Sequence, residues 1–565
     1  MKALRWTLLI ALLLHLPMLF SGAFMDDFVH RAALDAEEPM GQMGPMSLFD
    51  FGSSEDFQRA ADEPGARLPW FAGENWRVRF LRPLASLELS LAEALFPDSE
   101  VPRHVVGLLG LLALILAARR LFQDLGLNAR ALAIATAVLA FSDSAVIPVG
   151  WSANRSTLWV LLFTVLAVNQ AQRGRIALAL GLCVVATLFK ESGLLAFPLV
   201  CARLLGIGGG DRHRMAARAC LLGALFVMAY LGHYIWAGYG TNCLFYAAPW
   251  STPIRYGLRL LTLMGVGLPS LIGPVPVDLA GLFPVVGAVM AVMGLLLTLL
   301  VVRTLRPDWR EHCAVPFLAL WTLLSFLPEA GAPASDRLLW MATLGAAGLL
   351  GIALDRRFTR WQAAPRRARL FSLGLLLCAL PLSAGNALLL GNMNRQIAAN
   401  TRALVSDIDL GQGPRDLFLI QASNAITAFG IAPAFHVLRQ DQEARFQHLQ
   451  VGRRGLRWTR TGPNSCTFES LDEPFLFGLF EKVYQTDEKA PVLGAHWSSP
   501  PFDVEAISVD EQGLRSVRFT ANRSLDSADM LFLIERGGVL ETIPAPALGS
   551  TLELPAGPPA IPLVP

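Results

Sequence analysis

The chain has 565 residues, of which 53% are hydrophobic and only 16% are charged, and its mean hydropathy is +0.46. A soluble chain carries about a quarter charged residues, so this composition predicts a membrane protein. The formal net charge of +2 gives no indication of a nucleic-acid partner.

Apolar stretches long enough to cross a bilayer recur from the first residues to about residue 391, because about 20 apolar residues span the hydrocarbon core. The candidate spans are 4–23, 102–118, 130–149, 156–171, 176–190, 193–205, 215–237, 282–302, 313–328, 338–354 and 370–391. A further stretch, 256–273, is apolar but is interrupted by Gly265, Gly267 and Pro269.

The arginines between the spans indicate the topology, because cytoplasmic loops are rich in Lys and Arg. Lys2 and Arg5 place the N-terminus in the cytoplasm. The later basic clusters fall within 119–130, 173–175, 203–218, 303–310 and 356–369. All of them are cytoplasmic only if 256–273 does not cross, so we expect that segment to be re-entrant or interfacial. This predicts an all-α polytopic membrane protein with about eleven transmembrane helices.

Two parts are predicted along the chain. Residues 1–391 form the transmembrane domain, whose long first external loop, 24–101, contains juxtamembrane helices. Residues 392–565 form an external C-terminal domain, and the strand-like stretches Leu417–Ile420, Val517–Thr520 and Met530–Ile534 predict that it is a small α/β or β-rich domain. The first span could instead be a cleaved signal peptide, which would leave the other crossings unchanged.

Charged residues at the external ends of spans are candidate functional residues, because a charge at mid-bilayer costs about 2.5–3.5 kcal/mol. Asp26 and Asp27 directly follow the first span. One carboxylate can act as a general base while the other holds a metal or an acceptor amide, although such a pair also fits a hydrated helix end. Arg155 begins the fourth span against the charge trend, which fits either a phosphate partner or a snorkelling side chain.

Two further charged motifs lie at the same level. Lys190 and Glu191 interrupt an apolar run, either as a self-neutralising turn or with the lysine directed into a lipid-phosphate cavity. Asp336 and Arg337 open the tenth span after a Pro/Gly-rich loop. A rim of carboxylates and cations at one face suits a lipid-linked phosphate substrate better than an ion pathway.

Several motifs resemble those of GT-C-type polytopic glycosyltransferases, in particular the transmembrane-and-tetratricopeptide-repeat O-mannosyltransferases and related polyprenyl-phosphate-mannose protein mannosyltransferases. The Asp26-Asp27 pair is similar to their first-loop acidic motif. The other matches are Arg82-Pro83-Leu84 with Leu95-Phe96 and His104 ("RPL…LF…H"), Trp151 to Arg155 ("W-x-S-G-R"), Phe189-Lys190-Glu191 ("S-K-E") and Asp336 to Trp340 ("E-R-x-L-Y").

The resemblance implies an inverting hexosyl- or mannosyl-type transferase that takes a sugar from a polyprenyl-phosphate donor at the external face. Asp26 would be the catalytic base, and Asp27 would support it or bind a metal. The carrier phosphate would be held by Arg155, Lys190 and Arg337. Supporting roles would fall to Arg82, His104, Glu191 and Asp336.

The sequence also departs from this family. The relatives have a His and a Glu before "W-x-S-G-R", where this chain has Ser142 to Ile147 with Asp143 as a displaced acid. The resemblance therefore leaves a divalent metal unassigned. The C-terminal part has no tetratricopeptide repeats, so acceptor recognition is not implied.

Two other functions stay open, namely a flippase or transporter of lipid-linked glycans and an inactive scaffold of the same fold in envelope polysaccharide assembly. The expected partners are a polyprenyl-phosphate sugar lipid, the membrane, and a protein, lipid or glycan acceptor. We expect a multi-pass protein of the bacterial inner membrane with a cytoplasmic N-terminus and a periplasmic C-terminal domain. In that oxidising compartment a disulfide between Cys243 and Cys466 is predicted.

Overall fold

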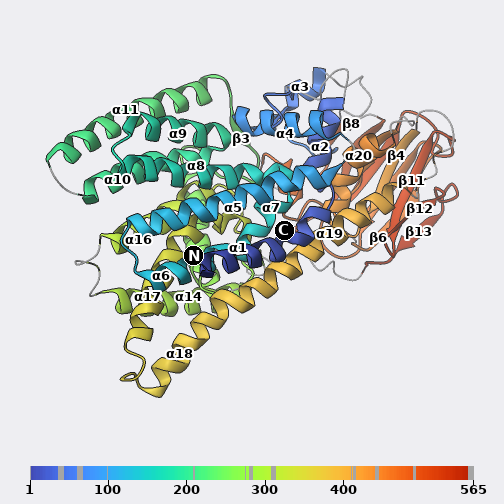
Figure 1. Ribbon diagram of the computed structural model, residues 1–565. Helices are drawn as coiled ribbons and strands as arrows, with labels where there is room; N and C mark the ends of the chain where they lie inside the picture. The colour runs from blue at the N-terminus through green and yellow to red at the C-terminus, as the bar shows by residue number, and fades with distance from the viewer. Residues whose placement is uncertain are drawn as a thin grey trace.

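The computed structural model divides into a helical part and a part built mainly of strands, which lie at opposite ends of the molecule in Figure 1. The residues it describes are 2–35, 43–59, 68–97, 99–207, 210–273, 275–278, 284–306, 309, 313–406, 408, 410, 415–439, 444–452, 454–487, 491–499 and 501–557.

The helical part takes up the chain to residue 406. Its α-helices are α1 (Lys2–His15), α2 (Asp26–Asp35), α3 (Ser54–Arg59), α4 (Pro83–Leu95), α5 (Glu100–Asp124), α6 (Ala129–Ala140), α7 (Val146–Gly150), α8 (Arg155–Gln172), α9 (Ile176–Phe189), α10 (Ala196–Ile207), α11 (Gly210–Trp236), α12 (Pro253–Ser270), α14 (Pro284–Leu305), α16 (Ala314–Glu329), α17 (Trp340–Thr359), α18 (Arg366–Leu377) and α19 (Ser383–Ser406). Short 3₁₀ turns are η1 (Leu16–Phe20), η2 (Asp143–Ala145), η3 (Ser152–Asn154), η4 (Glu191–Leu195) and η5 (Asp336–Leu339), and η6 (Cys378–Leu382) is a π-helical turn between α18 and α19.

The lengths of these helices fit a multi-pass membrane protein. Within the described residues, 6 helices are long and apolar enough to cross a bilayer, or up to 7 if the bent pair α6–α7 forms one span. Other predicted spans are helical but shorter, such as α9 and α16. The count of about eleven crossings therefore stays a prediction.

Helix α12 and the residues after it, predicted not to cross, return to the end of the bundle that carries the β-rich part. Near the start of α12, Arg259 donates to the carbonyls of Phe245 (2.7 Å) and Gly331 (3.0 Å). After its end, the amide of Val277 donates to the Asp336 carboxylate at 3.0 Å. Gly331 and Asp336 lie on either side of the short loop between α16 and α17, so both ends of the segment meet the same region.

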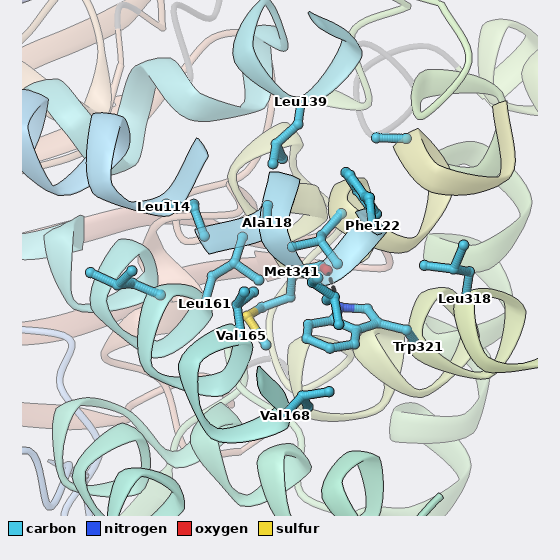
Figure 2. Close-up of a cluster of buried hydrophobic side chains, with 14 of the residues drawn as sticks. Leu114, Ala118, Phe122, Leu139, Leu161, Val165, Val168, Leu318, Trp321 and Met341 are labelled. Atoms are coloured by element: carbon cyan, nitrogen blue, oxygen red, sulfur yellow. Dashed lines mark hydrogen bonds between the residues drawn. The ribbon is translucent and has the colours of Figure 1, made fainter. Parts of the chain in front are cut away.

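Helix α17 is the centre of the helical part, with 83% of its most apolar window buried. Three glycines spaced at i, i+3 and i+6 let its neighbours approach, because a Cβ would fall 2.4–2.7 Å from the facing atoms at Gly345, Gly348 and Gly351. Such small-residue stripes allow close helix packing in membranes. Figure 2 shows the surrounding core, where the Trp321 indole donates to the Met341 carbonyl at 3.0 Å.

Three of the motifs that the sequence singled out lie at short 3₁₀ turns, each followed by an α-helix. The Trp151–Arg155 stretch forms η3 and begins α8, Lys190 and Glu191 lead into η4 and α10, and Asp336 and Arg337 form the start of η5 before α17. A 3₁₀ turn is tighter than an α-helix and redirects the chain at a helix end. These turns therefore bring the motif side chains to the bundle end that faces the β-rich part.

A small antiparallel sheet ties the first loop to the segment that follows α11. Its order is β1-β2-β3, from β1 (Asp50–Ser53), β2 (Arg77–Arg79) and β3 (Gly240–Asn242). Arg79 pairs with Asp50 at 2.7 Å across two of these strands. The first loop is thus fastened to the bundle at a point far along the chain.

The β-rich part confirms the predicted C-terminal domain class and contains two sheets. Its elements are β4 (Arg415–Gln421), α20 (Ala425–Leu438), β5 (Ala444–His448), β6 (Leu456–Arg460), β7 (Ser465–Ser470), η7 (Glu481–Val483), β8 (His496–Ser499), β9 (Phe502–Asp510), β10 (Gly513–Ala521), β11 (Met530–Arg536), β12 (Val539–Ile543) and β13 (Thr551–Leu554). An antiparallel sheet has the order β13-β6-β7-β10-β9-β8, and a mixed sheet has the order β12-β11-β4-β5 with β4 parallel to both of its neighbours.

Aromatic side chains from both sheets form the core of this domain. Phe418 of β4 lies 5.1 Å from Phe519 of β10 and 6.0 Å from Phe468 of β7, measured between ring centroids. The stretches predicted as strands at 417–420, 517–520 and 530–534 lie within β4, β10 and β11. At the predicted boundary after residue 391, however, α19 continues without a break to Ser406.

The predicted disulfide between Cys243 and Cys466 is wrong, because both cysteines are free thiols. Cys466 lies inside the aromatic core of the β-rich domain, on β7. Cys243 is buried in a different cluster with Trp76, Val78 and Phe245. The two cysteines therefore belong to separate hydrophobic cores.

Candidate active site

Asp26 is the first residue of α2 and lines a cavity of about 360 Å³. The preceding residue, Met25, has φ +45°, a left-handed backbone conformation that non-glycine residues rarely adopt. Strain of this kind persists where the surrounding structure fixes it, and it is common at functional sites. Burial raises the pKa of Asp26, and the guanidinium groups of Arg337 and Arg82 oppose that rise.

The cavity lies between the helical part and the β-rich domain. One side is formed by α2, the first loop and Arg337, and the other by α20, β5 and the segment around η7. Trp76 and Tyr484 stack across it with ring centroids 5.6 Å apart. Among the lining residues that the structure describes, Asp26 and Arg337 are the only ones of the types Asp, Glu, Lys and Arg. The site is therefore a largely apolar cavity with one acid and one cation.

Asp27, the second predicted catalytic carboxylate, connects two segments of the chain through hydrogen bonds in this structure. Its Oδ2 accepts a hydrogen bond from the Phe24 amide (3.1 Å) and its Oδ1 accepts one from the Ala153 amide (2.9 Å). Burial, with a smaller contribution from Glu100, raises the pKa of Asp27 to about 8. The side chain thus joins the start of α2 to the Trp151–Arg155 stretch.

Arg337 is the predicted phosphate-binding cation that does line the cavity. Its guanidinium lies 5.6 Å from the ring centroid of Trp151, a cation–π contact, and it forms no ion pair or hydrogen bond with a residue that the structure describes. The neighbouring Asp336 is engaged elsewhere. Its carboxylate accepts from the Val277 amide at 3.0 Å, beside Asp278, and so connects to the segment after α12, while its predicted supporting role in the site stays a prediction.

Arg155 does not face the cavity. Its side chain is 0% exposed, and its guanidinium donates to Glu88 of α4 at 2.6 Å and to Ser152 at 2.7 Å. The sequence prediction had placed this guanidinium on a phosphate. The structure gives it a carboxylate partner from the first loop instead, which was not anticipated because Glu88 carries no motif.

Lys190, Arg82 and Glu191 are also paired. Lys190 lies 3.2 Å from Glu329 and 3.3 Å from the Thr157 hydroxyl. Arg82 pairs with Glu191 at 2.9 Å, and its guanidinium lies 4.4 Å from the Phe80 ring centroid. The Arg82–Glu191 pair joins the start of α4 to η4, and the supporting role of both residues stays a prediction.

His104 of α5 is fully buried below the start of α2. Its Nε2 lies 3.2 Å from the Gly22 carbonyl and 3.3 Å from the Ser21 hydroxyl. Gly22 has φ +79°, where a side chain would be strained. His104 therefore fixes the turn that leads into Asp26, which is consistent with a supporting rather than a catalytic position.

Sequence reasoning missed Tyr246, whose side chain lines the cavity. Its hydroxyl forms no hydrogen bond with a residue in the described ranges, and burial raises its pKa to about 12 while Arg337 opposes the rise. Tyr246 lies in the segment between α11 and α12, where the aromatic pair with Phe245 was the one available signal. The contribution of α20, β5 and Tyr484 to the wall was missed as well, because the C-terminal part carried no recognisable site motif.

The described residues do not fit a metal site beside Asp26. No group of three or more His, Cys, Asp or Glu side chains that could hold a metal ion occurs in the described part of the chain. Asp27 already uses both carboxylate oxygens on backbone amides. Asp143, the displaced acid of the sequence comparison, is held by Ser383 and Asn386 of α19.

Comparisons with known proteins give a distant structural likeness. No protein-family model and no curated protein sequence matches the chain. Its fold is similar to that of the oligosaccharyltransferase of Archaeoglobus fulgidus, in the apo form (TM-score 0.39, 11% identity, 79% of this chain and 64% of that chain). The same enzyme tethered by a disulfide to an acceptor peptide with the NVT sequon gives a TM-score of 0.38, 12% identity and coverage of 79% and 63%. The chain spans less than two thirds of the length of these structures, and no residue role is transferred from them.

Proposed function

We propose that this protein is a membrane glycosyltransferase that transfers a sugar from a polyprenyl-phosphate donor to an acceptor hydroxyl. The observation that carries the proposal is the presence of both Asp26 and Arg337 in the lining of one cavity. Both side chains line it, and neither forms an ion pair or hydrogen bond with a described residue. Both side chains are partly buried, and an acid and a cation left without protein partners in an apolar cavity are costly, so such residues commonly mark a ligand site.

The proposed reaction assigns one task to each residue. The Asp26 carboxylate takes the proton of the acceptor hydroxyl, whose oxygen attacks the anomeric carbon of the sugar. The bond from that carbon to the phosphate oxygen breaks with inversion, and the polyprenyl phosphate leaves with the bonding electrons. Arg337 stabilises the charge that develops on the phosphate, as a guanidinium fork matches phosphate oxygens. No step uses a metal ion.

The raised pKa of Asp26 supports its assignment as the base. A general base works best when its pKa lies near the working pH, and burial moves this carboxyl in that direction. The pocket around it is apolar, which limits water and strengthens electrostatic interactions.

We narrow the set of phosphate-binding residues to Arg337. Arg155 and Lys190, expected beside it from the resemblance, already have Glu88 and Glu329 as partners. They are proposed as positioning residues that hold the Trp151–Arg155 stretch and the α9–α10 connection. The mannosyl-type donor, about eleven crossings and a periplasmic site remain part of the same proposal.

The test is a transfer assay on the intact chain in membranes. Membranes with the wild-type chain are supplied with radiolabelled sugars on polyprenyl phosphate, mannose first, and label is followed into membrane products. The Asp26→Asn variant is expected to lose about 10²–10⁴-fold of the transfer rate. Asp35→Asn, at the exposed end of the same helix, is the matched control and should transfer normally.

Each other outcome selects a different function. Normal transfer by Asp26→Asn would remove the catalytic assignment. Movement of the labelled lipid across the bilayer without sugar transfer would indicate a transporter. Binding of the donor by the wild-type chain without turnover would indicate an inactive scaffold.

A further inference from the structure

An apolar loop of the β-rich domain exposes two of its large side chains, while Leu476 and Phe480 pack against the protein. It comprises Leu476–Phe480, in the sequence Pro474-Phe-Leu-Phe-Gly-Leu-Phe480. The side chains of Phe477 and Leu479 are 60% and 45% exposed. Leu476 has φ +66°, a left-handed conformation that is strained for a branched side chain. The fold therefore holds large apolar side chains outward at a backbone cost.

The residues just after this loop are fastened to the helical part. The Phe245 amide donates to the Lys482 carbonyl (2.9 Å), and the Leu244 amide donates to the Gln485 carbonyl (2.8 Å). The Phe480 ring also stacks on Phe245, with centroids 6.2 Å apart. The loop therefore ends within a few residues of the points at which the chain contacts the connection between α11 and α12.

That connection is continuous with an exposed apolar surface. The Phe245 carbonyl accepts from Arg259 of α12 at 2.7 Å. The same helix exposes Ile254 (79%), Leu258 (62%) and Leu261 (68%), spaced i, i+4 and i+7 on one face. An apolar stripe of this kind on a helix next to membrane spans is typical of a segment that lies in the bilayer interface.

Exposed tryptophans flank the same region. Trp236 ends the membrane span α11 and is 84% exposed, and Trp250, in the connection to α12, is 64% exposed. Tryptophan is enriched at the level of the lipid head groups, because its ring is apolar and its indole N–H is polar. These residues mark the interface level on the side of the bundle that carries the β-rich domain.

We propose that the Leu476–Phe480 loop inserts into the bilayer interface beside α12 and anchors the β-rich domain to the membrane surface. The occupant of its apolar face is lipid, because the contacts of Phe245 with Phe480 and with Arg259 connect the loop to α12, the helix that carries the exposed apolar stripe.

The anchor would affect the position of one wall of the cavity. Phe480, Val483 and Tyr484 follow the exposed residues directly and line the cavity opposite Asp26. Contact of Phe477 and Leu479 with lipid would thus fix the position of that wall relative to the bundle. The proposal concerns membrane contact alone and does not depend on the proposed sugar transfer.

The test places a photo-crosslinking residue at the loop of the full chain in nanodiscs of phosphatidylethanolamine and phosphatidylglycerol. Phe477→p-benzoylphenylalanine is a conservative change in shape. Ile254→p-benzoylphenylalanine, on α12, is the lipid-facing reference, and Leu548→p-benzoylphenylalanine, 63% exposed elsewhere on the β-rich domain, is the matched water-facing control. After irradiation, lipid adducts are counted by mass spectrometry of the peptides.

Position 477 is expected to yield at least about tenfold more lipid adduct than position 548, and an amount comparable with position 254. Yield at the level of position 548, with adducts present at 254, would overturn the proposal. The same irradiation in native membranes addresses the alternative occupant. Crosslinks from 477 to another polypeptide in place of lipid would overturn the proposal in favour of a protein-docking surface.

Discussion

The charged residues around the cavity form two groups that differ in whether they have a partner. In the first group, Asp26 and Arg337 face the cavity and are unpaired among the described residues. The second group consists of three ion pairs between separate elements, Arg155–Glu88, Lys190–Glu329 and Arg82–Glu191. In the sequence, Asp26, Arg155, Lys190 and Arg337 were equivalent features, namely charges at the ends of apolar spans.

This difference in pairing indicates which charged residues are available to interact with a ligand. A buried ion pair fixes the register of two elements, but its desolvation penalty offsets most of its Coulombic gain. A buried charge without a partner has only the penalty, unless a ligand supplies the partner. We therefore expect changes in the paired group to appear mainly in stability, and changes in the unpaired group to appear mainly in turnover.

The largest expected effect on stability comes from Arg155→Ala. The guanidinium is fully buried and Glu88 is 17% exposed, so removing the cation leaves a carboxylate unpaired in an apolar site. The expected loss is about 3–5 kcal/mol, measured as a lower midpoint of thermal unfolding by tryptophan fluorescence in nanodiscs.

Two variants accompany Arg155→Ala. The double change Arg155→Met with Glu88→Leu removes both charges and should recover most of the stability. Arg120→Ala breaks a pair with Asp124 in which the arginine is 54% exposed, and it should cost about 0.3–0.5 kcal/mol. A double variant as unstable as the single one would show that Arg155 stabilises the fold through contacts other than Glu88.

Arg337→Gln is the corresponding change in the unpaired group. The Arg337 guanidinium has no ion-pair partner among the described residues, so its removal leaves no carboxylate uncompensated. The unfolding midpoint should therefore change little. Turnover in the polyprenyl-phosphate transfer assay should fall about 10²–10³-fold, as when one donor to a developing oxyanion is removed. Lys190→Gln should do the reverse, with lower stability because the buried Glu329 carboxylate loses its partner, and with a smaller loss of turnover. Equal losses of turnover in both variants would erase the distinction between the groups.

The pH dependence of transfer tests the interaction between Asp26 and Arg337. Asp26 must be ionised to accept a proton, so kcat/KM should fall tenfold per pH unit below its pKa. Burial raises that pKa, so the inflection should lie above the ordinary range of an aspartate. In Arg337→Gln the opposing charge is lost, and the inflection should move to higher pH. An inflection unchanged by this substitution would show that the two groups do not interact.

Sequence reasoning predicted the elements of the site more reliably than their contacts. Membrane helices follow from apolar length alone, and charged residues at the ends of apolar spans stand out in the sequence, so the positions of Asp26 and Arg337 were accessible. The partners Glu88 and Glu329 were not, because an ion pair between residues tens of positions apart has no signature in one sequence.

The cavity wall shows the same limit. Strands such as β4 and β11 follow from short apolar runs of Leu, Ile and Phe, and both were predicted. The way in which the β-rich domain packs against the first loop depends on long-range contacts such as Trp76 with Tyr484. The predicted Cys243–Cys466 disulfide failed for the same reason, since a shared compartment does not imply proximity.

The smallest expected effect concerns Tyr246, a cavity residue without charge. Its hydroxyl has no hydrogen-bond partner among the described residues, and its raised pKa keeps it protonated at neutral pH, as a donor. If it donates to the donor lipid or the acceptor, Tyr246→Phe should weaken transfer by about 0.5–1.5 kcal/mol, or roughly two- to twelvefold.

The unfolding midpoint of Tyr246→Phe should be unchanged, because the ring contacts with Phe80 and Phe245 persist. Tyr239→Phe, outside the cavity, is the matched control and should transfer at the wild-type rate. A loss of transfer in Tyr246→Phe that appears only in KM would place the hydroxyl on the bound substrate, whereas a loss only in kcat would place it on the departing phosphate or the attacking oxygen. In either case an uncharged residue would join the unpaired group. The property that defines this group would then be a hydrogen-bonding atom on the cavity that has no protein partner among the described residues, and not the charge of the residue.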